Sequence, residues 1–574
     1  MCRRVRLSVA FLALASPLVG QKSSVPPQSP AKLSTRSDLV LVPVIVTDKA
    51  GNPVSSLAKD AFTVEENGKR RSLSLFEETR TEKLAVFPTE SAGGTYSNFL
   101  FHDNHTLRIT IMVLDMLNTP WIRQTEARKQ LADYLLRVTS RDEPMALFGL
   151  NSNGLHQLHP FTRDTQVLIL ALQKLKLSLG SEERTQPPAT LTDDPSIDQQ
   201  ATDEEQLMSD MMQDLNDAIT ANYQRMATRQ TLYAMTQIAR ALQSIPGRKT
   251  LIWATAGFPF IIDDPNFFGR QGDDLGPEYQ DAWRALDSAN IAVYPVDLSS
   301  VDFAPKALPS ANATVSKSQI NTIRGTNGLR SPVNLPYDQG VQQRLTMHAF
   351  AEATGGRACV TISELEKCFA QAVDDSRSYY LLGYYLGDDT QPGWRKIKVK
   401  VAGDGLHVRF RNGFYVAAKL PDTPEQRRKE IVDALASPVQ YTGLRLTVRQ
   451  LSTVNQPAIP PAGEQVASAA AQTKSAEFML GLMGDSVTVD REKGNAVDLQ
   501  ITTLAFDSSH KSIATSSKAL ATTFNPEMLE KILHTGIGIP EKVELPPGKY
   551  EIKFAVRDNL TGVIGTISLP LTLN

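Results

Sequence analysis

The 574-residue chain has little excess charge, few cysteines and, beyond its first twenty residues, no long apolar run. Its formal net charge of -2 at pH 7 gives no electrostatic basis for binding nucleic acid or an anionic membrane surface. Three cysteines are too few for a disulfide scaffold. A transmembrane helix needs about 18 or more apolar residues in succession, and none is predicted after removal of the N-terminus. These absences favour an ordinary globular protein.

Signatures of common enzyme classes are missing as well. The chain has no Gly-x-Ser-x-Gly elbow, no Gly-x-x-x-x-Gly-Lys phosphate loop and no reactive-cysteine signature. His156 and His159 form a His-x-x-His pair, but a zinc site usually takes three or four ligands on a recognisable frame. We therefore predict that the protein is not an enzyme.

The N-terminus is typical of a secretory signal peptide. Three arginines precede a short apolar run at residues 7–15, and Pro17 follows it. Cleavage fits after Ala15 or after Gly20. A buried N-terminal helix is the alternative, but the run is short and lies between arginines and a proline. The sequence therefore predicts a signal peptide at 1–20 and a secreted or periplasmic mature protein with no transmembrane segment.

Hydrophobic patterns divide the rest of the chain. Residues 109–114 are continuously aliphatic or β-branched, which is typical of a strand buried on both faces of a parallel sheet. Strand and helix patterns then alternate to residue 385, which predicts right-handed crossovers in a mostly parallel sheet, and residues 394–402 and 406–415 are expected to finish the domain as an antiparallel pair. Residues 38–80 alternate like strands and contain the hairpin turn Asn67-Gly68. Residues 438–574 have short strands between turns, as in a β-sandwich.

A chain of this length is too long for one hydrophobic core. The predicted fold class is multidomain α/β plus β, with a doubly wound, mostly parallel sheet flanked by a small N-terminal β module and a C-terminal β-sandwich. The predicted segments are the signal peptide at 1–20, a linker at 21–37, the β module at 38–80, an α/β domain at 104–416 with insertions near 181–206 and 303–339, a linker helix at 417–437 and the sandwich at 438–574.

Polar residues follow the predicted buried strands of the α/β domain. Asp115 and Asp297 each end such a strand, Thr255 ends another, and Asn118 follows Asp115. In open α/β sheets, ligands bind outside the carboxyl ends of the strands. The sequence therefore predicts a ligand-binding edge that includes Asn118, Thr255 and Asp297.

The strand that ends in Asp115 resembles the first strand of a von Willebrand factor A-type domain. Further stretches, in order, resemble acidobacterial secreted proteins related to that family, over roughly residues 39–415. The resemblance implies a doubly wound α/β fold, secretion and interaction with a protein partner, without naming the ligand. The matching stretches are Leu41-Val-Pro-Val-Ile-Val-Thr-Asp, Phe62-Thr-Val-Glu-Glu-Asn-Gly, Asp115-x-x-Asn-Thr-Pro, Ile245-Pro-Gly-Arg-Lys, Thr354-Gly-Gly, Tyr379-Tyr-Leu-Leu-Gly-Tyr and Arg409-Phe-Arg-Asn-Gly-Phe-Tyr.

Domains of this family carry a metal-ion-dependent adhesion site. Its motif, Asp-x-Ser-x-Ser, is matched here by Asp115-Met-Leu-Asn-Thr119, so a leucine replaces the first serine. Thr228 is the candidate for the threonine of a later loop, and the final Thr-Asp-Gly becomes Thr255-Ala-Gly, without its carboxylate. The resemblance implies a degenerate site of Asp115, Thr119 and Thr228 that would hold Mg²⁺ or another divalent cation weakly.

Chemistry of the residues favours a different use of Asp115. A hard cation such as Mg²⁺ prefers near-octahedral coordination by oxygen atoms, and this motif offers one carboxylate. Aspartate and threonine after a strand frequently cap the next helix or accept hydrogen bonds from loop N–H groups. We expect that second role for Asp115, with metal binding as the alternative.

Cys359 and Cys368 are the two cysteines of the predicted mature chain. In an oxidising compartment, a disulfide between them would persist and would close a short loop. The alternative is two small buried apolar side chains. The sequence leaves both open.

These observations predict a secreted, non-enzymatic protein-interaction or adhesion protein that binds at the carboxyl edge of the sheet. One alternative is a hydrolase of envelope polymers with an accessory sandwich, which needs two carboxylates in a cleft. Another is a structural component of an envelope complex, which would show a large apolar surface patch away from Asp115.

Overall fold

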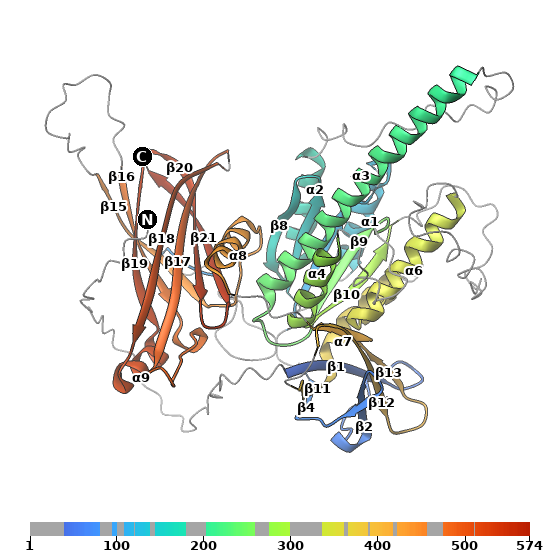
Figure 1. The fold of residues 1–574 in the computed structure, drawn as a ribbon, viewed down its shortest axis with the longest axis horizontal. Coiled ribbons are helices and arrows are strands. Elements are labelled where there is room, and N and C mark those ends of the chain that lie inside the picture. The colour runs from blue at the N-terminus through green and yellow to red at the C-terminus, as the bar shows by residue number, and fades with distance from the viewer. Residues whose placement is uncertain are drawn as a thin grey trace. The chain divides into compact units, whose positions relative to one another are not determined.

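The computed structural model describes residues 39–80, 94–99, 108–119, 121–137, 144–178, 203–258, 275–298, 336–360, 365–387, 391–416, 422–455, 474–509 and 511–573. The predicted signal peptide and linker lie outside these residues. So do residues 179–202 and 299–335, which include most of the two predicted insertions. Strands of the described residues form five sheets (Figure 1).

One sheet of five strands is mixed. Its order is β10 (Ile291–Asp297), β9 (Lys249–Thr255), β6 (Thr110–Asp115), β7 (Met145–Asn151) and β8 (Gly154–Thr162). Neighbours from β10 to β7 are parallel, and β8 is antiparallel to β7. Every residue of β6 is buried, as its apolar run predicts. The helices of this part of the chain are α1 (Trp121–Arg137), α2 (Thr165–Ser178), α3 (Asp203–Leu242), α4 (Gly276–Ser288), α6 (Pro336–Thr354) and α7 (Leu365–Arg377).

Two antiparallel sheets combine strands from residues 39–80 with strands from residues 378–416. The first has the order β13 (His407–Phe410), β1 (Leu39–Thr47), β11 (Ser378–Tyr385) and β4 (Leu75–Arg80). The second has the order β14 (Gly413–Val416), β12 (Gly393–Val401), β2 (Phe62–Glu66) and β3 (Lys69–Arg71). The predicted boundary between a module at 38–80 and a domain ending at 416 is therefore not where the sheets divide.

The C-terminal part contains two further antiparallel sheets that share one hydrophobic core. One has the order β19 (Ile537–Leu545), β16 (Lys474–Leu482), β15 (Leu446–Asn455) and β5 (Thr95–Ser97). The other has the order β18 (Ser512–Thr523), β17 (Ala496–Asp507), β20 (Gly548–Asp558) and β21 (Ile564–Leu573). β5 comes from far upstream in the sequence and pairs with β15. The helices here are α8 (Pro424–Ala436) and α9 (Pro526–Thr535).

The predicted fold class is wrong. Four of the five described sheets are antiparallel and the fifth is mixed, so the fold is not built on one doubly wound, mostly parallel sheet. Sequence periodicity identifies a strand and the number of its buried faces, but it does not identify the partner strand. β11, which was expected to continue the α/β series, pairs instead with β1, more than 300 residues upstream, and β12 pairs with β2 as well as with β14.

Local sequence signals that need no distant partner agree with the structure. Asn67 and Gly68, with φ of 47° and 79°, form the predicted turn between β2 and β3, where glycine adopts positive φ without strain. The side chain of Thr423 accepts a hydrogen bond from the Gln426 N–H at the start of α8. Among the described residues, no helix is both long and apolar enough to cross a membrane.

A buried ionic network joins the mixed sheet to the sheet that contains β1. The Asp375 carboxylate on α7 accepts hydrogen bonds from the Tyr294 hydroxyl on β10 (2.7 Å) and from two guanidinium nitrogens of Arg409 on β13. Arg248, also buried, donates to the Tyr294 hydroxyl (3.2 Å) and to the Gly355 carbonyl (2.6 Å). Burial, followed by the charge of Asp375, raises the pKa of Tyr294 to about 12.

A second buried ion pair gives the protein a pH-dependent stability. Asp287 on α4 lies 2.9 Å from the guanidinium of Arg411, in the turn between β13 and β14. Burial raises the pKa of Asp287 from 3.8 to about 6, although Arg411 opposes the rise. The folded state therefore binds a proton at Asp287 more tightly than the unfolded state does. Its contribution to the free energy of unfolding rises as pH falls through 6 towards 3.8.

Replacing Asp287 by asparagine should remove this pH dependence. Between pH 7 and pH 5, we expect the wild-type free energy of unfolding to rise by about 1 kcal/mol relative to that of Asp287→Asn. Urea unfolding of both proteins at the two pH values measures this difference. If the free energy of unfolding of the wild type relative to Asp287→Asn stays constant, or falls at pH 5, the raised pKa of Asp287 in the folded state is contradicted.

Candidate functional site

The side chain of Asp115 is fully buried at the carboxyl end of β6, and three N–H groups donate to it. Oδ1 accepts from the backbone N–H of Asn118 at 3.0 Å. Oδ2 accepts from Nδ2 of Asn118 at 2.7 Å and from Nε1 of Trp253 on β9 at 3.0 Å. Burial raises the pKa of Asp115, and the bonds from Asn118 and Trp253 oppose that rise. Asp115 thus holds the β6–α1 loop by accepting hydrogen bonds from N–H groups, which is the role that we expected from the sequence.

Thr119 links this loop to the segment that follows β9. Its hydroxyl donates to the Asp115 carbonyl at 2.6 Å and accepts from the Ala256 backbone N–H at 3.1 Å. The neighbouring Thr255 hydroxyl donates to the Gly257 carbonyl at 2.6 Å. All of these atoms lie on buried residues, so the two loops are held together by hydrogen bonds rather than by an exposed polar surface.

Two buried threonines, Thr228 and Thr231, lie three residues apart on α3. The Thr231 hydroxyl accepts a hydrogen bond from Nδ2 of Asn118 at 2.9 Å. Positions three residues apart lie on one face of a helix, so the predicted Thr228 shares that face with Thr231. Thr231 and Trp253 are the two network members that sequence reasoning missed. An apolar strand offered no signal that its tryptophan would donate a hydrogen bond.

The residues around Asp115 do not fit a divalent cation. Mg²⁺ needs about six oxygen ligands close to 2.1 Å. Here Oδ2 of Asp115 already accepts hydrogen bonds from the side-chain N–H groups of Asn118 and Trp253. The Thr119 hydroxyl is already hydrogen-bonded to two backbone groups. Leu117, which replaces a motif serine, packs against the core. Within the part of the chain that the structure describes, no group of three or more His, Cys, Asp or Glu side chains is placed to hold a metal ion.

Asp297 ends β10 at the same edge and holds the guanidinium of an arginine side chain. Its carboxylate is 1% exposed and accepts from Nε of Arg344 on α6 at 3.1 Å. The Arg344 side chain is 42% exposed, although its guanidinium is anchored at one end by Asp297. Arg344 was not predicted, because only the tertiary fold brings α6 to the end of β10. It is a charged group at this edge that both is fixed and faces outward.

Cys359 and Cys368 form a disulfide, which was one of the two possibilities left open by the sequence. The backbone N–H of Cys359 donates to the Pro295 carbonyl at 2.8 Å, and its carbonyl accepts from the Asp297 N–H at 2.9 Å. The bridge therefore ties the start of α7 to the segment beside the end of β10, next to Asp297.

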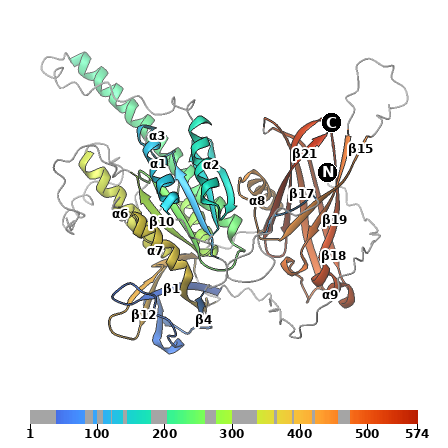
Figure 2. The ribbon, with the colours of Figure 1, turned by 180° about the vertical axis from the view of Figure 1, so that it is seen from behind.

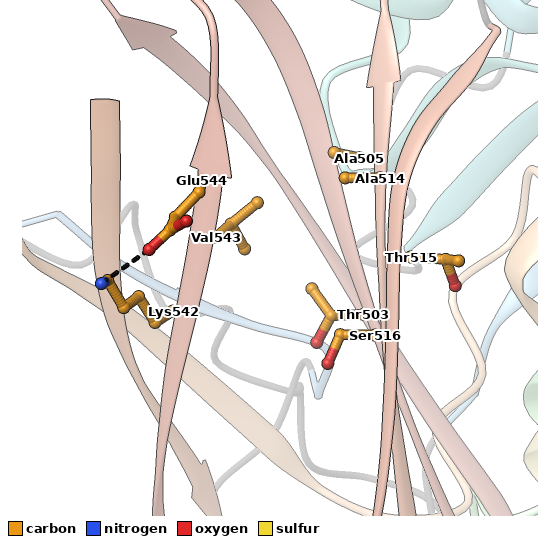
Figure 3. A pocket seen from close by; sticks show the side chains of 8 residues that line it. All are labelled: Thr503, Ala505, Ala514, Thr515, Ser516, Lys542, Val543 and Glu544. Atoms are coloured by element: carbon orange, nitrogen blue, oxygen red, sulfur yellow. Dashed lines mark ion pairs between the residues drawn. The ribbon is translucent and has the colours of Figure 1, made fainter. Parts of the chain in front are cut away.

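A cavity of about 250 Å³ lies in the C-terminal sandwich between β17, β18 and β19 (Figure 3). Small side chains line most of it, and Lys542 and Glu544 form an ion pair at 2.8 Å. Glycoside hydrolysis commonly uses two carboxylates, whereas this lining has one, and it is paired. The cavity gives the hydrolase alternative no support. Its lining residues are Thr503, Ala505, Ala514, Thr515, Ser516, Lys542, Val543 and Glu544.

Comparison with known proteins adds little to the geometry. No protein-family model matches the chain. No curated protein matches it. Among solved structures, the chain is similar to the pilus adhesin SpaC from Lactobacillus rhamnosus GG, with 9% sequence identity and a TM-score of 0.21. The match covers 86% of this chain and 57% of that chain, and it supports no inference on fold or function. The resemblance to von Willebrand factor A-type domains therefore stays a prediction from the sequence.

Proposed function

We propose that the protein is a secreted, non-enzymatic binding protein, and that it contacts a protein partner through the carboxyl edge of the mixed sheet. Secretion rests on the N-terminal sequence pattern. The binding edge rests on Arg344, whose side chain is 42% exposed while its guanidinium is held by the buried Asp297. An anchored arginine loses less conformational entropy on binding than a free one, and arginine is enriched among the residues that dominate protein interfaces.

The rest of the edge supports this use as a rigid platform. The hydrogen bonds of Asp115 and Thr119 fix the β6–α1 loop against the segment after β9. Binding residues are commonly placed on loops that a rigid scaffold positions. A guanidinium pairs best with a carboxylate in two-point geometry, so the partner would present an acidic side chain to Arg344.

The test compares two arginines of similar exposure. Arg344→Gln removes the charge but keeps a donor for Asp297, and Arg377→Gln changes a 49% exposed arginine paired with Asp374 on α7. The immobilised mature protein is crosslinked to secreted and envelope proteins of the source organism, and the affinity of each captured protein is then measured for both variants. We expect at least tenfold weaker binding by Arg344→Gln and no change for Arg377→Gln.

Equal binding by both variants would overturn the proposal, as would the absence of any captured protein. Thermal unfolding of Arg344→Gln checks that a loss of binding does not follow from a loss of folding.

A further inference from the structure

Helix α3 continues far beyond the part that packs on the mixed sheet. At 40 residues it is about 60 Å long. Its second half buries Leu232, Met235, Ile238 and Leu242 in the core. Figures 1 and 2 both show its first half running past the ends of the sheet strands.

The first half carries a row of large apolar side chains in solvent. Apart from the adjacent Met211 and Met212, they are spaced three or four residues apart, which places them on one face of the helix over five turns. Met208 and Met226, at the two ends of the row, lie 18 residues apart, which returns to the same direction at 3.6 residues per turn. We call this row the α3 stripe; its residues and exposed fractions are Met208 61%, Met211 62%, Met212 58%, Leu215 59%, Ile219 38%, Tyr223 43% and Met226 59%.

The α3 stripe lies on the side of the helix opposite to the side that enters the core. Met226 is exposed and Met235, nine residues later, is fully buried, and nine residues correspond to two and a half turns. The stripe is therefore not a continuation of the core-facing side. The helix therefore has two apolar surfaces that face in opposite directions. The surface on its second half is buried in the core of the same chain, and the α3 stripe on its first half is exposed. An exposed apolar patch of this length marks an interaction site.

The stripe is self-complementary about residue 217. When a second copy of the helix is placed antiparallel with its centre there, Met208 lies opposite Met226, Met211 opposite Tyr223, and Leu215 opposite Ile219 of the other copy. Burial of these side chains would remove on the order of 700 Å² per copy from water, close to the roughly 800 Å² per partner of a specific protein interface.

Charge along the helix favours the antiparallel arrangement. Residues 203–217 contain six acidic residues and no basic one, whereas residues 218–242 contain three arginines and no acidic one. Antiparallel pairing sets the acidic end of each helix beside the part of the other helix that carries Arg225 and Arg229. Parallel pairing would place like charges together.

We propose that the first half of α3 is a homodimerisation surface, in which the α3 stripes of two chains pack antiparallel. The side chains of the α3 stripe are already exposed in the single chain, so they are accessible to a second copy without unfolding of the helix. The α3 stripe does not include Arg344, so separate variants test the two proposals.

Mass measured by light scattering across a concentration series tests the dimer. The mature wild-type chain should show twice the mass of one chain. Leu215→Ser combined with Ile219→Ser should raise the dissociation constant at least tenfold, because it removes the central contacts. Leu170→Ser is the matched control, since it changes a leucine that is 55% exposed on α2. A wild-type monomer up to 100 μM, or a dimer that the double variant leaves unchanged, would overturn the proposal and leave the stripe to another occupant.

Disulfide trapping tests the orientation. Met208→Cys and Met226→Cys chains, mixed and oxidised, should form a disulfide-linked heterodimer, while either variant alone should crosslink at least tenfold less. Efficient crosslinking of Met208→Cys to itself would indicate parallel helices and contradict the proposed arrangement.

Discussion

Replacing Asp375 with alanine should lower the free energy of unfolding by about 3–5 kcal/mol, because it removes one partner of a buried ion pair. The Arg409 guanidinium and the Tyr294 hydroxyl would both lose their shared acceptor. These groups come from α7, β13 and β10, so the loss falls on the junction between the mixed sheet and the sheet that contains β1. The low exposure of Asp375, 7%, keeps water from replacing the carboxylate.

The neighbouring residue supplies the control. Asp374 is 55% exposed and pairs with Arg377 one helical turn away. Exposed pairs of this kind contribute about 0–1 kcal/mol, so Asp374→Ala should change stability little. Urea unfolding of the two variants beside the wild type measures both effects. Equal losses for Asp374→Ala and Asp375→Ala would show that the buried network does not hold the junction.

Replacing Asp115 with alanine should lower the free energy of unfolding by about 3 kcal/mol, because it removes the acceptor of three N–H groups at once. Nε1 of Trp253 would be left in the core without its Asp115 acceptor, and the β6–α1 loop would lose the bonds from Asn118. Asp115→Asn should cost less, since one amide oxygen still accepts while the amide N–H₂ faces a donor. Denaturant unfolding ranks the two variants against the wild type.

The wild type and Asp115→Ala together also test whether Asp115 binds a divalent cation. A cation held by the folded state raises the free energy of unfolding in proportion to the logarithm of its concentration. Because N–H groups occupy Oδ2 of Asp115, we expect millimolar Mg²⁺, Mn²⁺ or Ca²⁺ to leave the wild-type melting temperature unchanged. A rise in the wild type that Asp115→Ala lacks would contradict this reading and restore the adhesion-site hypothesis.

Features decided by a few neighbouring residues could be predicted from the sequence. The continuous apolar run of β6 predicted a strand buried on both faces, and Asn67-Gly68 predicted the hairpin turn between β2 and β3. The loop role of Asp115 followed from the preference of aspartate for nearby N–H groups, one of which belongs to Asn118, three residues away. The cysteines 359 and 368, nine residues apart, offered a bridge that the structure contains.

Features that depend on a distant partner were decided by the tertiary structure. β1 and β11 each look like strands, but an alternating or apolar pattern does not record which strand lies alongside, and so the expected parallel sheet was wrong. The placement of Trp253 beside Asp115 and of Arg344 beside Asp297 likewise depends on chain packing. The physical reason is the same in each case: side-chain periodicity encodes whether a face is buried, whereas the identity of the group that buries it is set by contacts between segments far apart in the chain.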